Sequence, residues 1–83
     1  MKIVISKPAR RALERSNKRV LLVRKIEELS RNPDALTGNV KRLVGKPGFR
    51  LRVQDWRVIY RVEDDVLYID EIEPRGPIYE DRK

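Results

Sequence analysis

The sequence predicts an α+β fold in which a short N-terminal strand and a pair of helices precede a three-stranded antiparallel meander. Two periodicities predict it. Apolar residues recur every three or four positions between residues 20 and 29, as in a helix, and they alternate with polar residues between 49 and 72, as in strands. A helix pair that covers one face of a small sheet would bury the apolar sides of both.

The first two elements are a strand and a helix joined at Ser6. Residues 2–5 are rich in β-branched side chains, which favour a strand. Ser6 is a favourable N-cap residue, and Pro8 is tolerated in a first helical turn. The sequence therefore predicts a first helix over residues 7–15.

A second helix is expected after Asn17, which we interpret as its N-cap. It should end near Asn32, because the proline that follows disfavours helical conformation in the residue before it. The two helices are close enough in sequence to form an antiparallel hairpin. The apolar stripe of the second helix is predicted to contain Val20, Leu22, Val23, Ile26 and Leu29.

Residues 33–48 contain several prolines and glycines and are expected to form a loop with at most one short turn of helix. Three runs of alternating polar and apolar residues follow and should form the meander. Turn residues at Asp55 and at Asp64–Asp65 separate the runs. The three runs cover residues 49–54, 56–62 and 66–72.

Composition restricts the chemistry that the chain can perform. A chain of 83 residues is expected to form one domain spanning residues 1–83. The sequence has no cysteine and no histidine, which excludes disulfides, thiolate zinc sites, a cysteine nucleophile and an imidazole base. We expect no cofactor and no metal. No apolar run approaches the length of a membrane span, so a cytoplasmic protein is expected.

The charge is high and unevenly distributed. Lys and Arg number 20 against 13 acidic residues, a net charge of +7. Residues 1–61 hold 17 basic and 5 acidic residues, a local charge of +12, whereas residues 62–83 hold 3 basic and 8 acidic residues, a local charge of −5. A field of this kind attracts polyanions, so nucleic acid, an acidic protein or both are expected partners.

Alternation along the strands predicts a basic sheet face. Arg50 and Arg52 point away from the apolar side of their strand, and Arg57 does the same in the next run. A tight hairpin would crowd these three arginines, which is unfavourable for like charges across strands. An anionic ligand would offset the repulsion, and an ordinary solvent-exposed face is the alternative. Trp56 falls on the apolar face and is expected in the core.

The stretch VKRLVGKPGFRLRVQDWRVIYRVEDDVLYIDEIEPRGPIYE, residues 40–80, resembles the C-terminal half of toxins of the RelE/ParE superfamily. The pattern typical of these toxins is Leu-x-Gly, then Arg-Leu-Arg-Val, a short turn, Tyr/Trp-Arg-Val-Ile-Tyr and a final Arg-x-x-x-Tyr. The N-terminal strand and helix hairpin suit the same family, so the resemblance covers nearly the whole chain. It implies a RelE-like fold and the toxin of a type II toxin–antitoxin pair.

The resemblance to RelE-like members implies a ribosome-dependent endoribonuclease that cuts mRNA in the A site and arrests translation. Arg57 and Arg75 would stabilise charge on the phosphate, while Arg50 and Arg52 would orient the backbone and one of them is a candidate acid. Tyr79 would activate the 2′-hydroxyl, stack on a base or simply pack on the sheet. The best-known RelE-type enzymes carry lysines at the places of Arg50 and Arg52, and the general base is left open.

The same resemblance implies an acidic cognate antitoxin, the ribosome and mRNA as partners. Three basic residues of the glycine-rich loop are candidate RNA contacts, unless they are ordinary solvated side chains: Lys41, Arg42 and Lys46. The alternative function is that of a ParE-like toxin that inhibits DNA gyrase by protein binding without RNA cleavage. A catalytically inactive chain that binds RNA or antitoxin is a third interpretation. Paired carboxylates at Glu71 and Glu73 are disfavoured as a glycosidase or metal site.

Overall fold

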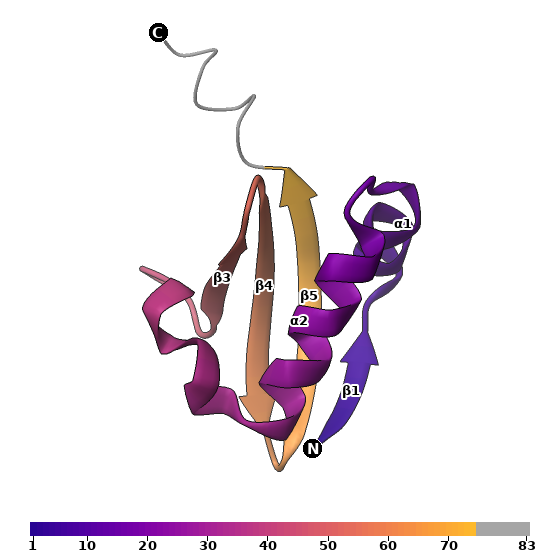
Figure 1. Ribbon diagram of the computed structural model, residues 1–83. Helices are drawn as coiled ribbons and strands as arrows, with labels where there is room; N and C mark the ends of the chain where they lie inside the picture. The colour runs from indigo at the N-terminus through magenta and orange to yellow at the C-terminus, as the bar shows by residue number, and fades with distance from the viewer. Residues whose placement is uncertain (75–83) are drawn as a thin grey trace, which may run out of the picture.

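The structure is a computed structural model that describes residues 1–74. Its elements are β1 (Lys2–Ile5), α1 (Lys7–Arg15), α2 (Arg19–Arg31), the 3-10 helix η1 (Pro33–Asn39), β2 (Val40–Arg42), β3 (Phe49–Val53), β4 (Trp56–Glu63) and β5 (Val66–Pro74) (Figure 1). The predicted α+β class and element order are confirmed. No helix within residues 1–74 is long and apolar enough to cross a membrane.

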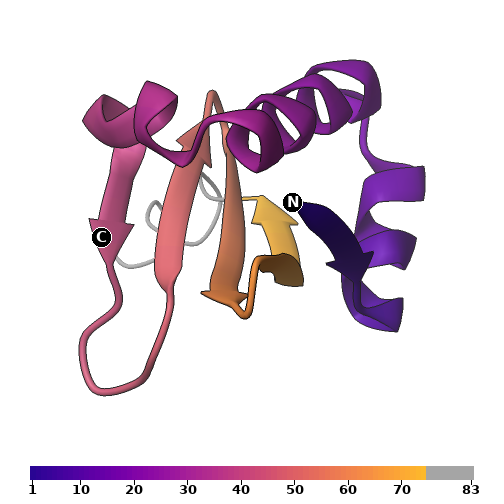
Figure 2. The same cartoon turned by 90° about the horizontal axis from the view of Figure 1, so that it is seen from below.

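The sheet has five strands in the order β1-β5-β4-β3-β2. The three predicted strands form the antiparallel meander β3-β4-β5, and β1 joins its edge in parallel with β5. The strand β2 was not predicted: the expected loop at 33–48 contains η1 and these three residues, which pair antiparallel with β3. α2 and η1 lie across one face of the sheet (Figure 2).

The core lies between this covered face and the helices. Tyr60 of β4 stacks on Phe49 of β3 with ring centroids 5.4 Å apart, and Trp56 packs half-buried against the core as predicted. The buried apolar side chains come from both layers: Ala9, Leu13, Leu22, Ile26, Leu29, Leu36, Leu51, Val53, Val58, Tyr60, Leu67, Ile69 and Ile72. The buried residues of all three period-two runs thus face the helices.

The predicted stripe of α2 is only partly correct. Leu22, Ile26 and Leu29 are buried, but Val20 is 68% exposed and Val23 is 36% exposed. Residues two apart on a helix do not face the same side, so Val20 and Leu22 could not both meet the sheet. The rotation of α2 about its axis is set by Leu22, Ile26 and Leu29, which leaves the two valines at the surface.

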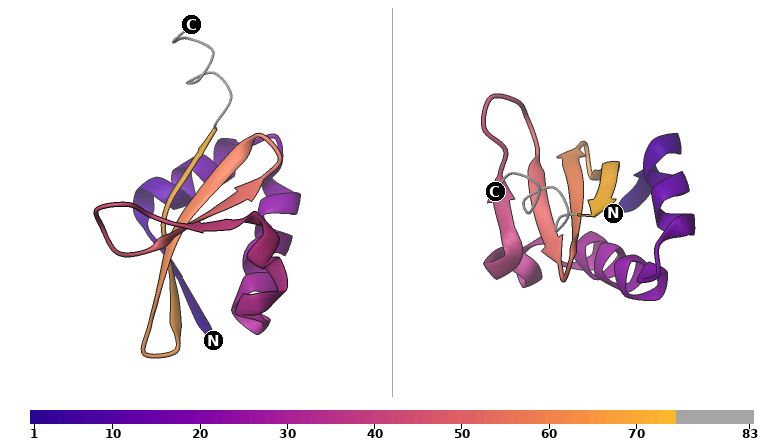
Figure 3. Two further views of the ribbon diagram at one scale, coloured as in Figure 1. Left: turned by 90° about the vertical axis from the view of Figure 1, so that its left-hand side faces the viewer. Right: turned by 90° about the horizontal axis from the view of Figure 1, so that it is seen from above.

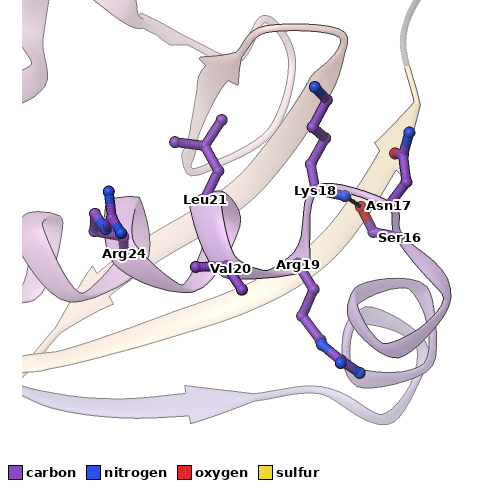
Figure 4. A pocket seen from close by; sticks show the side chains of 7 residues that line it. All are labelled: Ser16, Asn17, Lys18, Arg19, Val20, Leu21 and Arg24. Atoms are coloured by element: carbon purple, nitrogen blue, oxygen red, sulfur yellow. Dashed lines mark hydrogen bonds between the residues drawn. The ribbon is translucent and has the colours of Figure 1, made fainter.

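The predicted N-cap of α2 is wrong by one residue. The cap position is Lys18 rather than Asn17, and its side chain makes no capping hydrogen bond. The backbone N–H of Lys18 donates instead to the hydroxyl of Ser16 at 2.9 Å (Figure 4). A serine–backbone turn of this kind replaces the expected asparagine cap.

Ser6 ties the start of α1 to the opposite end of the chain. Its hydroxyl accepts from the N–H of Ala9 at 3.1 Å, as an N-cap should, and donates to the carbonyl of Asp70 at 2.8 Å. The register of β4 and β5 shifts there: Ile59 pairs with Glu71 and Tyr60 with Ile69. Asp70 is therefore the extra residue of a β-bulge, and Ser6 provides a partner for its carbonyl.

Replacing Ser6 with Ala should lower the free energy of unfolding by about 2 kcal/mol, because the N-cap bond and the partner of the Asp70 carbonyl are lost together. Ser6→Thr keeps the hydroxyl and should retain most of the stability. Urea unfolding of both variants and wild type measures the difference. Equal midpoints for Ser6→Ala and wild type would contradict this role of the hydroxyl.

Residues 43–48 form a loop that projects past the sheet on the side opposite α2 (Figures 2 and 3). The N–H of Leu43 donates to the carbonyl of Gly48 at 3.0 Å and closes the loop. Gly48 has a φ of +117°, and a Cβ at this position would lie 2.8 Å from the carbonyl oxygen of Tyr60. The loop therefore requires glycine at this position to pass close to β4.

Candidate functional site

The face of the sheet that α2 does not cover, here called the outer face, brings together the cations that the sequence predicted. Cα partners across β2 and β3 are Lys41 and Arg50, and partners across β3 and β4 are Arg52 and Arg57. The residues between them, such as Leu51, are buried on the opposite side. These four cations form one group, called the basic cluster below: Lys41, Arg50, Arg52 and Arg57.

The cations of the outer face differ in their partners. Arg57 Nη2 lies 3.4 Å from the Glu73 carboxylate across β4 and β5, and the two side chains are 12% and 36% exposed. Within residues 1–74, no carboxylate lies within ion-pair distance of Arg50 or Arg52. The positive charges of Arg50 and Arg52 on β3 therefore repel each other, and no acidic side chain of residues 1–74 pairs with them.

Arg61, further along β4, is held in a different way. Its guanidinium donates to both oxygens of Asp70, at 2.8 and 3.2 Å, and to Glu63 at 2.9 Å, and it lies over the ring of Tyr68. The hydrogen bonds to Asp70, reinforced by Glu63, raise the pKa of Arg61 above its ordinary value. The Arg61 guanidinium is thus hydrogen-bonded to carboxylates of β4 and β5, and Arg61 is not part of the basic cluster.

The three predicted RNA-contacting residues are divided between two places. Lys41 belongs to the basic cluster. Arg42 points to the other face of its strand, with its guanidinium 5.8 Å from the ring centre of Phe49. Arg42 and Lys46 line a hollow of about 320 Å³ at the base of the 43–48 loop. The loop thus carries a second concentration of positive charge beside the sheet.

Arg75 and Tyr79, the remaining members of the predicted catalytic set, lie outside the described residues. Within residues 1–74, no group of three or more acidic residues is placed to hold a metal ion. Sequence reasoning missed the contact between Glu73 and Arg57. Strict alternation from Leu67 and Ile69 would have put Glu73 on the buried face, and the bulge at Asp70 brings it opposite Arg57.

A second surface lies at the start of α2. The exposed side chains of Val20 and Val23 lie beside Arg19, Arg24 and one carboxylate, Glu27, around a shallow hollow of about 310 Å³. A neighbouring hollow of about 440 Å³ extends to the Ser16 turn, and Figure 4 shows the residues that surround it. This surface combines apolar groups with mainly basic ones, whereas the outer face of β3 presents mainly cations.

Comparison with known proteins shows which family the chain matches. The family described as ParE toxin of type II toxin–antitoxin system, parDE, matches residues 3–79. No curated protein sequence matches the chain.

Solved structures share the fold over most of their length. The archaeal RelE–RelB complex from Pyrococcus horikoshii is 26% identical, with a TM-score of 0.73 over 90% of this chain and 94% of that one. The YoeB/ParE toxin from Agrobacterium tumefaciens is 22% identical, with a TM-score of 0.76 over 90% and 99%. The intact E. coli RelBE toxin–antitoxin complex is 20% identical, with a TM-score of 0.71 over 90% and 96%.

Proposed function

The chain belongs to the ParE toxin family of type II toxin–antitoxin systems, and we propose that it arrests translation by cutting mRNA in the ribosomal A site of the cytoplasm. The observation that carries this proposal is the basic cluster. Arg50 and Arg52 lie on an open sheet face without a described carboxylate partner, beside Arg57. Like charges held together in this way are stabilised when a polyanion binds, and the phosphate backbone of mRNA is such a ligand.

Each cation has a proposed role in the cleavage. Arg57 stabilises the charge that develops on the phosphate, since its planar donor groups can bind two phosphate oxygens together. Arg50, Arg52 and Lys41 hold the backbone on either side. Lys46 contacts RNA from the loop, which projects on the same side as the outer face (Figure 3). Arg42, at the end of β2, contacts RNA from the hollow at the base of that loop. Arg75 and Tyr79, which lie outside the described residues, complete the proposed set.

The ribosome is a necessary partner in this proposal. The outer face is an open strand surface, and a few side chains on it cannot alone hold RNA in the in-line geometry that cleavage needs. Ribosome-bound mRNA is already oriented, so the protein has only to supply charge and proton transfer. Efficient cleavage of free RNA by small amounts of purified protein would contradict this dependence.

A cognate acidic antitoxin is the second proposed partner. The similar structures from Pyrococcus horikoshii and E. coli described above are toxins in complex with an antitoxin. In this chain, the apolar and basic surface at the start of α2 suits an amphipathic acidic helix: Val20 and Val23 would be covered, while Arg19 and Arg24 would meet its carboxylates. Electrostatic attraction to this surface would also accelerate association.

Replacing both Val20 and Val23 with Asp should weaken the complex with the antitoxin by about 10²-fold, because two charges would be buried against an acidic partner. Val44→Asp changes a valine that is almost fully exposed in the distant loop and is the matched control. Titration calorimetry with the co-expressed antitoxin measures both. Unchanged affinity in the double variant would exclude this surface as the docking site.

The matched family is that of ParE toxins, which favours as a second candidate the ParE-like function expected from the sequence, inhibition of DNA gyrase by protein binding. Expression from a tightly repressed promoter separates the two. Rapid arrest of protein synthesis, with mRNA ends inside codons, is expected for the nuclease. Gyrase-dependent DNA damage and altered plasmid supercoiling, with intact mRNA, would instead establish the gyrase inhibitor and overturn the proposed nuclease.

A further inference from the structure

Cleavage of RNA through its 2′-hydroxyl needs a group that accepts the hydroxyl proton, and this chain has few candidates. It has no histidine or cysteine. Arginine stays protonated in proteins and is a poor acceptor. Tyr60 lies in the core, and burial raises its pKa above the ordinary tyrosine value, which keeps its hydroxyl protonated. Tyr79, the candidate base that the sequence offered, lies outside the described residues. Within residues 1–74, carboxylates are the side chains that can accept a proton and already carry none at neutral pH.

The carboxylates on the outer face of β4 and β5 are not equivalent. Glu63 and Asp70 are both hydrogen-bonded to Arg61. Glu71 pairs across the strands with Ile59, an apolar residue. Glu73 is the carboxylate on these two strands that contacts the basic cluster, 3.4 Å from Arg57. Glu73 therefore contacts the cation proposed to bind phosphate, and it is not among the carboxylates that are hydrogen-bonded to Arg61.

We propose that Glu73 is the general base that takes the 2′-hydroxyl proton when RNA is bound at Arg57. This assignment rests on the proposed nuclease function. The Arg57 side chain is 12% exposed, whereas the Glu73 side chain is 36% exposed and therefore more open to a ligand. In RNA, the 2′-oxygen lies next to its own 3′-phosphate. A phosphate held by Arg57 therefore brings that hydroxyl toward the carboxylate that contacts the same guanidinium.

The reaction balances with these two side chains and water. A Glu73 carboxylate oxygen accepts the 2′-hydroxyl proton while the 2′-oxygen forms a bond to phosphorus. The bond from phosphorus to the 5′-oxygen breaks, and that oxygen takes a proton from water. Arg57 stabilises the charge on the non-bridging oxygens throughout. The products are a 2′,3′-cyclic phosphate and a 5′-hydroxyl, and Glu73 then releases its proton to solvent.

Other charged groups surround β5, so a control variant for Glu73 must lie among the same charged neighbours. Arg57 on β4 and Glu71 on β5 are near Glu73 in the sheet, and Arg52 lies beyond Arg57. β1 and α1 also pack on β5. The charged side chains on these two elements are Lys2, Lys7, Arg10, Arg11, Glu14 and Arg15. Glu71→Gln removes the same charge from the same strand in these surroundings, and it is the matched control.

The test is single-turnover cleavage on programmed ribosomes by the full chain, measured against pH and against protein concentration. Glu73→Gln should slow the maximal rate by about 10²–10³-fold. It should abolish the acid limb of the pH–rate profile and leave the half-saturating concentration unchanged or lower, because a negative charge beside Arg57 is gone. Glu71→Gln should cleave within about twofold of wild type, because its carboxylate has no part in the proton transfer.

A second variant makes the result independent of folding effects. Glu73→Asp keeps the carboxylate one methylene further away, so it should retain the acid limb with an intermediate rate. Identical rates and profiles for the Gln and Asp variants would overturn the assignment, and so would wild-type cleavage by Glu73→Gln. Failure of the wild type to cleave on ribosomes would overturn the nuclease function together with this inference.

Discussion

Replacing Arg57 with Ala is expected to slow mRNA cleavage on programmed ribosomes by about 10²–10³-fold, the cost of removing one donor that stabilises transition-state charge. Arg57→Lys should restore little, because a lysine is a point charge and cannot bind two phosphate oxygens through one planar group. Single-turnover rates at saturating protein measure this loss. Thermal unfolding should show a small decrease in stability, since the change leaves Glu73 without its ion pair.

Arg61→Ala is the matched control for this prediction. Arg61 lies on the same strand and face and also pairs with a β5 carboxylate, but it is held by Asp70 and Glu63 away from the basic cluster. Its loss should leave the cleavage rate within a few-fold of wild type. Full toxicity in cells expressing Arg57→Ala at normal levels would remove Arg57 from the proposed mechanism. Equal losses in both variants would point to a general electrostatic effect.

The largest expected effect on stability is that of Leu22→Ala, which should lower the free energy of unfolding by about 3 kcal/mol. Leu22 is fully buried between α2 and the sheet, and its truncation removes apolar contacts and leaves a cavity. Val20→Ala, two residues earlier on the same helix, removes a side chain that is mostly in water and should cost less than about 0.5 kcal/mol.

Urea denaturation of the two variants, followed by far-UV circular dichroism, measures this contrast. Equal midpoints for the two variants would mean that α2 is rotated about its axis relative to the structure described here. The comparison also bears on the antitoxin surface, because it tests whether Val20 can be changed without disturbing the fold. A stable Val20→Ala variant with weakened antitoxin binding would separate docking from folding.

The sequence predicted best those features that depend on neighbours in the chain. The first strand, the helix capped by Ser6 and the alternating runs of the meander all follow local periodicity or capping, and all are confirmed. The rotation of α2 about its axis was harder to predict, because valine and leucine are both apolar and the sequence does not show which of them is buried. Only packing against the sheet separates Val20 from Leu22.

Features set by distant parts of the chain could not be read from the sequence. The strand β2 has three residues and no apolar alternation of its own, so it exists as a strand through its pairing with β3. The contact between Arg57 and Glu73 depends on the register between β4 and β5, which shifts at Asp70. Sequence alternation assigned the residues of β3 and β4 to a face, but it could not reveal the bulge that turns Glu73 outward, nor which residues are neighbours across strands.

The parallel pairing of β1 with β5 has a consequence for how the toxin folds during its own synthesis. β1 is made first, but its partner residues lie 64 positions later, as in Lys2 with Val66. Such distant contacts form slowly, because the entropy of closing the intervening chain must be lost first, whereas the β3-β4-β5 hairpins are local. The meander can therefore form before the N-terminal strand docks. A chain interrupted before β5 has no partner for β1, so the sheet closes only in chains whose translation has reached the last strand.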